Sequence, residues 1–344
     1  SGRHLERVWS QLWLSCATYQ HGDIDLTRAE LDDVLTFSSQ EHILPTIGPQ
    51  VRQIQSRLVG IQDDPIIGVT FSAFMNEINQ NDAKLPATRR GLRHLASVIP
   101  ISKPQLTILA LGRAQVKINN KTISPPDWKT QSVRELFFYF LATNNAISKE
   151  QVGLTFWPDI EPAKLKMRFK NDIYRLRRAV GSDIITYEND FYAFNYALDY
   201  DYDVEIFESY LKQAENSSEQ QEQITYYQAA VDLVRGPYLA DVHMHWVWPE
   251  RERLNQVYIS TLLKLVGLYL SDKALEKAQK TCQRALEYDP CLEDIHRLLM
   301  KIHSLSGDRT AIARQYQVCK KVLRDELDIS PSEETERLFL QLTR

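Results

Sequence analysis

The chain has 344 residues, of which 43% are hydrophobic and 25% are charged, and its formal net charge is −4. This composition is typical of a globular protein with two or three domains and a sizeable core. No apolar run of about 18 residues occurs, so we expect no membrane span, no signal peptide and no membrane among its partners.

The four cysteines are Cys16, Cys282, Cys291 and Cys319, and no two of them have CxxC spacing. Scattered cysteines indicate buried, reduced thiols, whereas paired spacings indicate disulfides or a zinc site. We therefore expect a cytoplasmic protein without disulfides and without a bound metal.

Residues 1–100 are predicted to form a helical repeat arm. Apolar residues recur at helical spacing from Leu5 to Tyr19, and His21-Gly22-Asp23 then breaks the pattern. A second helix is expected from about Leu26 to Phe37, with further helical segments near 50–58 and 68–79. A helix, a Gly-Asp turn and a second helix form one unit of a helical repeat.

The pattern changes after a proline-containing boundary at 99–104, and residues 105–198 mix strands with helices. The predicted elements are strands at 106–111 and 114–118, helices at 132–143, 148–157 and 161–181, and a hairpin of 184–187 with 191–194. Strands, three helices and a hairpin, in this order, are typical of a winged helix-turn-helix domain.

The helix expected from Glu161 to Gly181 is amphipathic and strongly basic. Its apolar residues form one stripe at helical spacing, namely Leu165, Phe169, Ile173, Leu176 and Val180. It has seven basic and two acidic residues, a net charge of +5 in a chain of net charge −4. The third helix of a winged helix enters the major groove, so we expect double-stranded DNA as a partner.

The candidate DNA-binding residues lie on this helix and on the hairpin. Lys170, Asn171 and Arg178 are placed to reach base edges, where asparagine suits adenine and arginine suits guanine. Met167 and Tyr174 are expected to pack on sugars or on a thymine methyl group, and the other basic residues to neutralise phosphates. The full set is Lys164, Lys166, Met167, Arg168, Lys170, Asn171, Tyr174, Arg175, Arg177 and Arg178, with Asn189 and Tyr192 of the hairpin.

Residues 201–344 are predicted to be helical, and they carry 24 acidic against 18 basic residues, a net charge of −6. The segment 257–290 has the length and pattern of a tetratricopeptide-like repeat, and 291–325 repeats the helix pair. Such pairs bury their apolar faces by stacking, and the stack offers a surface to partners. The expected fold is therefore mostly α, with a small α+β winged helix between two sets of helical repeats.

From Leu106 onward the sequence resembles bacterial transcriptional activators of the SARP type. The motifs of an OmpR/PhoB-like winged helix are Leu111-Gly112, Trp128, Arg134-Glu135-Leu136, Tyr139-Phe140-Leu141, Trp157-Pro158-Asp159, Leu176-Arg177-Arg178 and Gly181. The motifs of the following bacterial transcriptional activator domain are Gly236-Pro237-Tyr238-Leu239, Glu250-Arg251, Arg253-Leu254, Arg284-Ala285-Leu286, Asp289-Pro290, Gly307-Asp308 and Ser330-Pro331. The resemblance implies that RNA polymerase and a second protomer on direct repeats are partners.

The first 100 residues are similar to the last repeats of the helical arm in STAND-type regulators, which are large signal-transduction ATPases. No GxxxxGK[ST] motif occurs in this chain, so nucleotide hydrolysis would belong to an upstream region. The resemblance implies that the chain is the C-terminal fragment of a larger regulator.

The sequence therefore predicts a DNA-binding transcription activator without enzymatic activity or a cofactor. Two other classes remain open, a protein-interaction scaffold and a ligand-sensing module with a winged helix that does not recognise a specific DNA sequence. Only the regulator requires binding to duplex DNA that falls steeply with salt.

Overall fold

The computed structural model describes residues 2–40, 47, 51, 53–54, 57–58, 60–95 and 104–344. The chain divides into two compact units, residues 1–91 and residues 92–344.

The first unit is helical, as predicted. It contains α1 (Gly2–Gln20), α2 (Ile24–Gln40), the 3-10 helix η1 (Ile61–Asp63) and most of α4 (Gly68–Leu95). Gly22, at φ 81°, turns the chain between α1 and α2, which is the break that the Gly-Asp pair predicted. Val8, Leu12 and Leu31 are buried in the shared core of this helix pair. The helix expected near 50–58 and the boundary expected at 99–104 lie largely outside the described residues.

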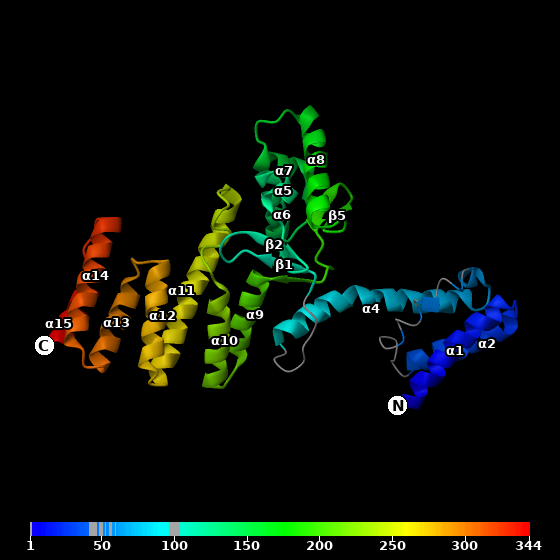
Figure 1. Cartoon of the computed structure of the whole chain (residues 1–344), viewed down its shortest axis with the longest axis horizontal. Coiled ribbons are helices and arrows are strands. Elements are labelled where there is room, and N and C mark those ends of the chain that lie inside the picture. Colours follow the sequence, from blue (N-terminus) through cyan, green and yellow to red (C-terminus); the bar gives the residue numbers. More distant parts are fainter. Residues whose placement is uncertain are drawn as a thin grey trace. The chain divides into compact units, whose positions relative to one another are not determined.

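The second unit begins with the small α+β region, shown at the centre of Figure 1. Its first sheet has the strand order β3-β2-β1-β7, with β1 (Leu106–Leu109), β2 (Gln115–Ile118), β3 (Lys121–Thr122) and β7 (Tyr200–Tyr202). The sequence predicted the first two strands but not β7, which runs parallel to β1 with Leu106 opposite Tyr200. Asn119-Asn120, at the turn between β2 and β3, has φ angles of 50° and 64°, a conformation that asparagine tolerates.

Three helices and a second sheet complete the winged helix. The helices are α6 (Gln131–Thr143), α7 (Lys149–Phe156) and α8 (Pro162–Val180), preceded by the short α5 (Pro125–Trp128), which sequence analysis missed. The second sheet has the order β4-β6-β5, with β4 (Ile147–Ser148), β5 (Ile185–Glu188) and β6 (Phe191–Phe194). Ser148 and Gln151 form the capping box that their spacing predicts at the start of α7.

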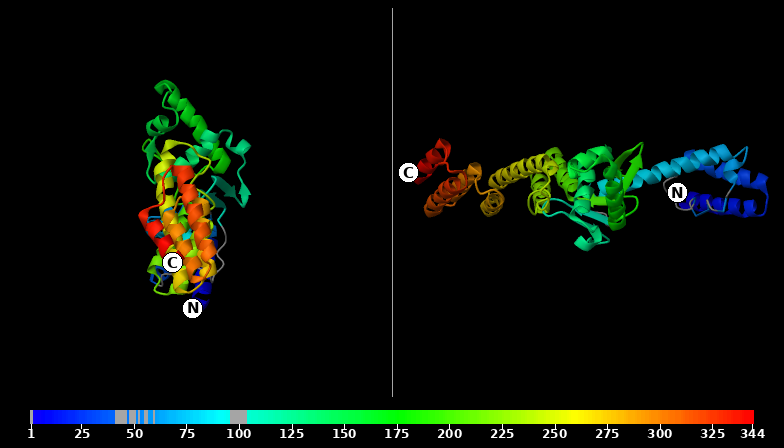
Figure 2. Two further views of the ribbon diagram at one scale, coloured as in Figure 1. Left: turned by 90° about the vertical axis from the view of Figure 1, so that its left-hand side faces the viewer. Right: turned by 90° about the horizontal axis from the view of Figure 1, so that it is seen from above.

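The rest of the second unit is a series of helices, which follow one another side by side in Figures 1 and 2. They are α9 (Asp203–Asn216), α10 (Gln220–Leu233), the 3-10 helix η2 (His245–Val247), α11 (Trp248–Ser271), α12 (Leu275–Tyr288), α13 (Glu293–Leu305), α14 (Arg309–Leu327) and α15 (Glu333–Thr343). Gly307, at φ 74°, forms the turn between α13 and α14. The expected fold class, mostly α with a small α+β region, is confirmed.

One hydrophobic core extends from the first sheet into these helices, and its buried residues run from Leu106 to Ile302. Sequence analysis separated a winged helix at 105–198 from helices at 201–344. The structure differs at this boundary, because β7 comes from beyond it and completes the sheet of the winged helix. The two regions are parts of one compact unit.

Asp203, the first residue of α9, links this helix to the residues that follow β1. Its carboxylate is 2% exposed and accepts hydrogen bonds from the backbone N–H groups of Ala110 at 2.8 Å and Leu111 at 3.0 Å. Arg235 donates to the same carboxylate at 2.7 Å. Burial raises the pKa of Asp203 to about 6, so at neutral pH it is mainly ionised beside this guanidinium.

The segment 235–242, which we call the seam segment, also returns to β1. The Leu239 N–H donates to the Ala110 carbonyl at 2.8 Å. Gly112 lies at φ 134°, and a Cβ at this position would approach the Arg235 side chain to 3.2 Å. Arg251 donates to three carbonyl groups of the seam segment at 2.6–2.8 Å. The Gly-Pro-Tyr-Leu and Glu-Arg motifs of this region therefore hold the winged helix against the helices.

The four cysteines are free, and all but the half-buried Cys291 are buried, as their scatter predicted. Burial raises the pKa of the Cys282 thiol to about 12. Within the described ranges, no helix is both long and apolar enough to cross a membrane. The same part of the chain contains no group of three or more His, Cys, Asp or Glu side chains that could hold a metal ion.

Candidate nucleic-acid interface

Helix α8 buries the apolar stripe that its sequence predicts. Phe169, Ile173 and Leu176 are buried. Leu165, nearer the start of α8, packs against Gly153 of α7, where a Cβ would lie only 2.8 Å from the leucine side chain. This glycine lets α7 and α8 approach closely, as the helix-turn-helix arrangement requires.

The opposite side of α8 is exposed. We call it the recognition face, and it consists of Lys166, Met167, Lys170, Asn171, Tyr174 and Arg178. Met167 and Tyr174 are 64% and 65% exposed, which is unusual for large side chains with so much apolar surface. Within the described residues, the four polar members of this face have neither a hydrogen bond nor an ion pair from their side chains. In Figure 1, α8 lies on the side of the winged helix that is remote from α9 and α10.

Two of the candidate arginines are anchored by a carboxylate that sequence analysis did not single out. Asp172 is completely buried, and Arg175 and Arg168 contact it at 3.0 Å and 3.3 Å. The Arg168 guanidinium also lies over the ring of Trp157, 5.3 Å from its centroid. Both arginines stay 40–46% exposed, so their guanidinium groups are held in place at the surface. The spacings of three and four residues could have revealed these pairs.

Lys164 lies in the first turn of α8 and forms an ion pair of 2.8 Å with Glu161. Both side chains are about 70% exposed, so this pair is weak and the lysine can exchange it for a phosphate.

Arg177 has a different environment from the recognition face. It is half-buried, and its Nη2 donates to the Ile185 carbonyl of β5 at 2.9 Å. Its Nε is buried and, within the described residues, has no hydrogen-bond partner. Sequence analysis grouped Arg177 with the phosphate-binding residues, but the structure places it between α8 and the hairpin, where it holds β5 in position.

Tyr192 of the hairpin is likewise half-buried, and it packs against aromatic side chains. Its ring lies 4.7 Å from that of Phe169 and 4.6 Å from that of Tyr187, and burial raises the pKa of its hydroxyl. The structure therefore assigns it to the contact between hairpin and α8. Asn189 remains exposed at the tip of the hairpin, at φ 50°.

A hollow of about 420 Å³ adjoins the recognition face and brings in a residue that sequence analysis missed. Lys129 lines it together with Asn171, Arg175 and Arg178, opposite the single acidic side chain of Asp127. Lys129 ends α5, and its exposed ammonium group adds a positive charge beside α8. The pattern Ser-Pro-Pro-Asp before it, which starts a short helix with a capping box, is the signal that could have located α5.

Alanine substitutions should separate phosphate contacts from structural contacts. Lys166→Ala is expected to reduce the slope of log affinity against log salt by about one unit, with stability unchanged. Arg177→Ala is expected to lower the free energy of unfolding by about 1–2 kcal/mol, because it removes a hydrogen bond to the hairpin. Denaturant unfolding and salt titrations of duplex binding measure both effects. Equal slopes for the two variants would show that Arg177 also binds phosphate.

Residues 202–343 match the family described as "Bacterial transcriptional activator domain". This part of the chain is a bacterial transcriptional activator domain. The match begins in β7 and covers every helix from α9 to α15. It confirms the resemblance to SARP-type activators that the Gly-Pro-Tyr-Leu and Glu-Arg motifs indicated.

A solved structure has a similar fold. Mycobacterium tuberculosis EmbR, in complex with a low-affinity phosphopeptide, superimposes with a TM-score of 0.56 at 16% sequence identity. The similarity covers 70% of this chain and 65% of EmbR, so this chain spans less than two thirds of that relative. No curated protein sequence matches this chain. The family match therefore concerns residues 202–343, and the structural similarity concerns the fold.

Proposed function

We propose that this chain is a sequence-specific DNA-binding transcription activator that inserts α8 into the major groove. The recognition face carries the proposal, because it combines unpaired cations with exposed Met167 and Tyr174 on the exposed side of a winged-helix third helix. The anchored Arg168 and Arg175 flank this face, and the activator domain follows in the same compact unit. In this proposal the chain has a regulatory and not a catalytic role.

Each type of side chain has its own task at the duplex. Lys164, Lys166, Arg168 and Arg175 neutralise phosphates, and Lys129 joins them. Asn171 donates to and accepts from adenine, and Arg178 and Lys170 donate to guanine. Met167 and Tyr174 pack on a thymine methyl group or on sugars. Asn189 lets the hairpin contact the neighbouring backbone or minor groove.

We further propose that the activator domain contacts RNA polymerase or a second protomer in the cytoplasm. Helical repeats suit this task because stacked helix pairs present a continuous surface to partner proteins. In the full-length regulator the helices of residues 1–91 would belong to the arm that transmits a signal.

The test of this function is a titration of random and selected duplexes with the full chain, from about 50 to about 300 mM salt. The five phosphate-neutralising side chains predict a slope of roughly −4 to −5, together with enrichment of one sequence in repeated selection. A scaffold or ligand-sensing module without specific recognition predicts no enriched sequence. Absence of both the slope and the enrichment would contradict the proposal.

Asn171→Ala is expected to relax recognition at a single base pair. The substitution removes a bidentate hydrogen-bonded contact with adenine. This loss should cost about 1–3 kcal/mol of binding free energy on the best site and almost nothing on other sequences. Competition binding with a set of single-base variants of the selected site measures this effect. Lys166→Ala is the matched control, because it should weaken all sequences alike. A uniform loss for both variants would contradict the assignment of Asn171 to base contacts.

Binding is expected to be cooperative on two direct repeats about one helical turn apart. One winged helix contacts few base pairs, so a second protomer is needed for specificity among genomic sites. Inserting half a helical turn moves the second site to the other face of the duplex without changing any contacted base. The apparent affinity, measured by mobility shift, should therefore be lower for the duplex with the insertion than for the duplex without it. Equal affinities would indicate independent monomers.

A further inference from the structure

The activator domain, whose net charge is −6, has a hollow lined by three basic side chains. The hollow, which we call the α12 hollow, measures about 480 Å³ and lies between α10, α11 and α12. Lys277, Lys280 and Arg284 line it, opposite a single carboxylate, that of Asp232. The 144 residues around it carry 24 acidic and 18 basic residues, so this excess of positive charge is local.

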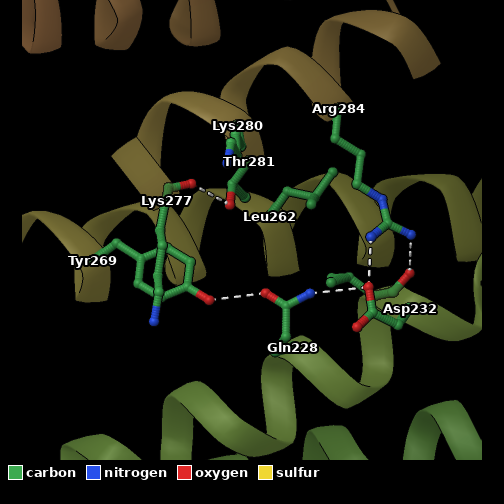
Figure 3. Close-up of a pocket in the computed structure, with 9 residues that line it drawn as sticks. Gln228, Asp232, Leu262, Tyr269, Lys277, Lys280, Thr281 and Arg284 are labelled. Carbon is green, nitrogen blue, oxygen red and sulfur yellow. Dashed lines mark hydrogen bonds and ion pairs between the residues drawn. The ribbon is translucent and has the colours of Figure 1, made fainter. Parts of the chain in front are cut away.

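A chain of hydrogen bonds fixes the floor of the α12 hollow (Figure 3). The Tyr269 hydroxyl donates to the Gln228 side chain at 2.8 Å, and Gln228 donates to Asp232 at 2.9 Å. Arg284 donates to the same Asp232 oxygen at 2.7 Å, and also to the Tyr258 hydroxyl and to two backbone carbonyl groups. The negative charge of Asp232 is thus neutralised within the floor, and the guanidinium already makes four hydrogen bonds there.

The two lysines are left to bind a ligand. They lie three residues apart on α12, which places them on the same side of the helix. The Lys277 ammonium lies 5.7 Å from the centroid of the Tyr269 ring, and within the described residues it has no carboxylate partner. Lys280 contacts Glu276 at 3.5 Å, but both side chains are more than 70% exposed, so this pair is weak.

From this arrangement we propose that the α12 hollow binds an acidic segment of a partner protein. Two flexible ammonium groups on one side of a helix match two carboxylates of an extended peptide. A phosphate would favour a free arginine fork, whereas Arg284 is already occupied. Duplex DNA would be repelled by the net charge of −6 on this domain.

The proposal is tested with fluorescein-labelled peptides and the full chain. The probes are a dodecapeptide made of three Glu-Leu-Glu-Gly repeats and the same peptide with glutamine in place of each glutamate. Fluorescence anisotropy at low salt should show at least about tenfold tighter binding of the glutamate peptide. The double variant Lys277→Glu, Lys280→Glu should remove this preference without changing the affinity for duplex DNA.

The double variant Lys301→Glu, Lys320→Glu is the matched control, because it makes the same charge change at exposed positions of α13 and α14. It should keep the preference for the glutamate peptide, and both double variants should melt at the same temperature as the wild type. Equal binding of the two peptides, or an equal loss in both variants, would overturn the proposal.

Displacement of the peptide by inorganic phosphate would assign the hollow to a small anion, and lost affinity for DNA in the α12 variant would assign it to the duplex. Either result would also overturn it.

Discussion

Replacing both Lys170 and Arg178 with glutamate is expected to weaken binding to duplex DNA about a hundredfold near 100 mM salt. Both side chains belong to the recognition face and are exposed. Each lost phosphate or base-edge contact costs about a factor of ten, and the new carboxylates are repelled by the duplex. Affinity for the selected site, measured by anisotropy with a labelled duplex, tests this expectation.

The control for this experiment is the Lys301→Glu, Lys320→Glu variant, whose charge change lies in the activator domain. It should bind DNA within about twofold of the wild type, since charges beyond a Debye length of roughly 8–10 Å are screened. Similar losses in the two variants would mean that overall charge, and not α8, determines the affinity. Thermal unfolding should be unchanged in both, because none of the four side chains is buried.

Asp203→Ala is expected to cause the largest loss of stability, about 3 kcal/mol or more. The substitution leaves the N–H groups of Ala110 and Leu111 buried without an acceptor, and it removes the partner of Arg235. Denaturant unfolding of the full chain, followed by far-ultraviolet circular dichroism, measures the loss.

Asp325→Ala is a suitable comparison, because Asp325 is exposed on α14. It should change the free energy of unfolding by less than about 0.5 kcal/mol. If Asp203→Ala were equally mild, the link between β1 and α9 would depend on the seam segment and not on this carboxylate. A variant in which Gly112 is replaced by alanine would then show whether the close backbone approach matters more.

Sequence analysis could predict the elements whose signals are local. The stripe from Leu165 to Val180 fixes the buried side of α8, and Pro162 and Gly181 mark its two ends. Asn119-Asn120 and Asn189-Asp190 both adopt the positive φ angles that favour tight hairpin turns. For these elements the relevant contacts lie within a few residues along the chain.

The missed features depend on residues that are distant in sequence. Strand β7 has only three residues, and its parallel pairing with β1 joins positions that are 94 residues apart, as with Leu106 and Tyr200. No periodicity in so short a segment can reveal such a partner. For the candidate site, composition identified the basic helix, but it could not distinguish exposed Lys170 from Arg177, whose guanidinium is turned toward β5.

The shared sheet of the second unit has a consequence for how this protein can be recombined. A chimaera cut at residue 198 or 200 would separate β1 from β7 and would leave Ala110 and Leu111 without the Asp203 carboxylate. For the chimaera to fold, the donor activator domain would have to supply its own equivalents of β7 and of the Asp203 carboxylate. The smallest portable module therefore runs from residue 104 through the seam segment at least to Arg251 of α11, which donates to three carbonyl groups of that segment. Exchanges of helices after α11 should be tolerated better than exchanges at the winged-helix boundary.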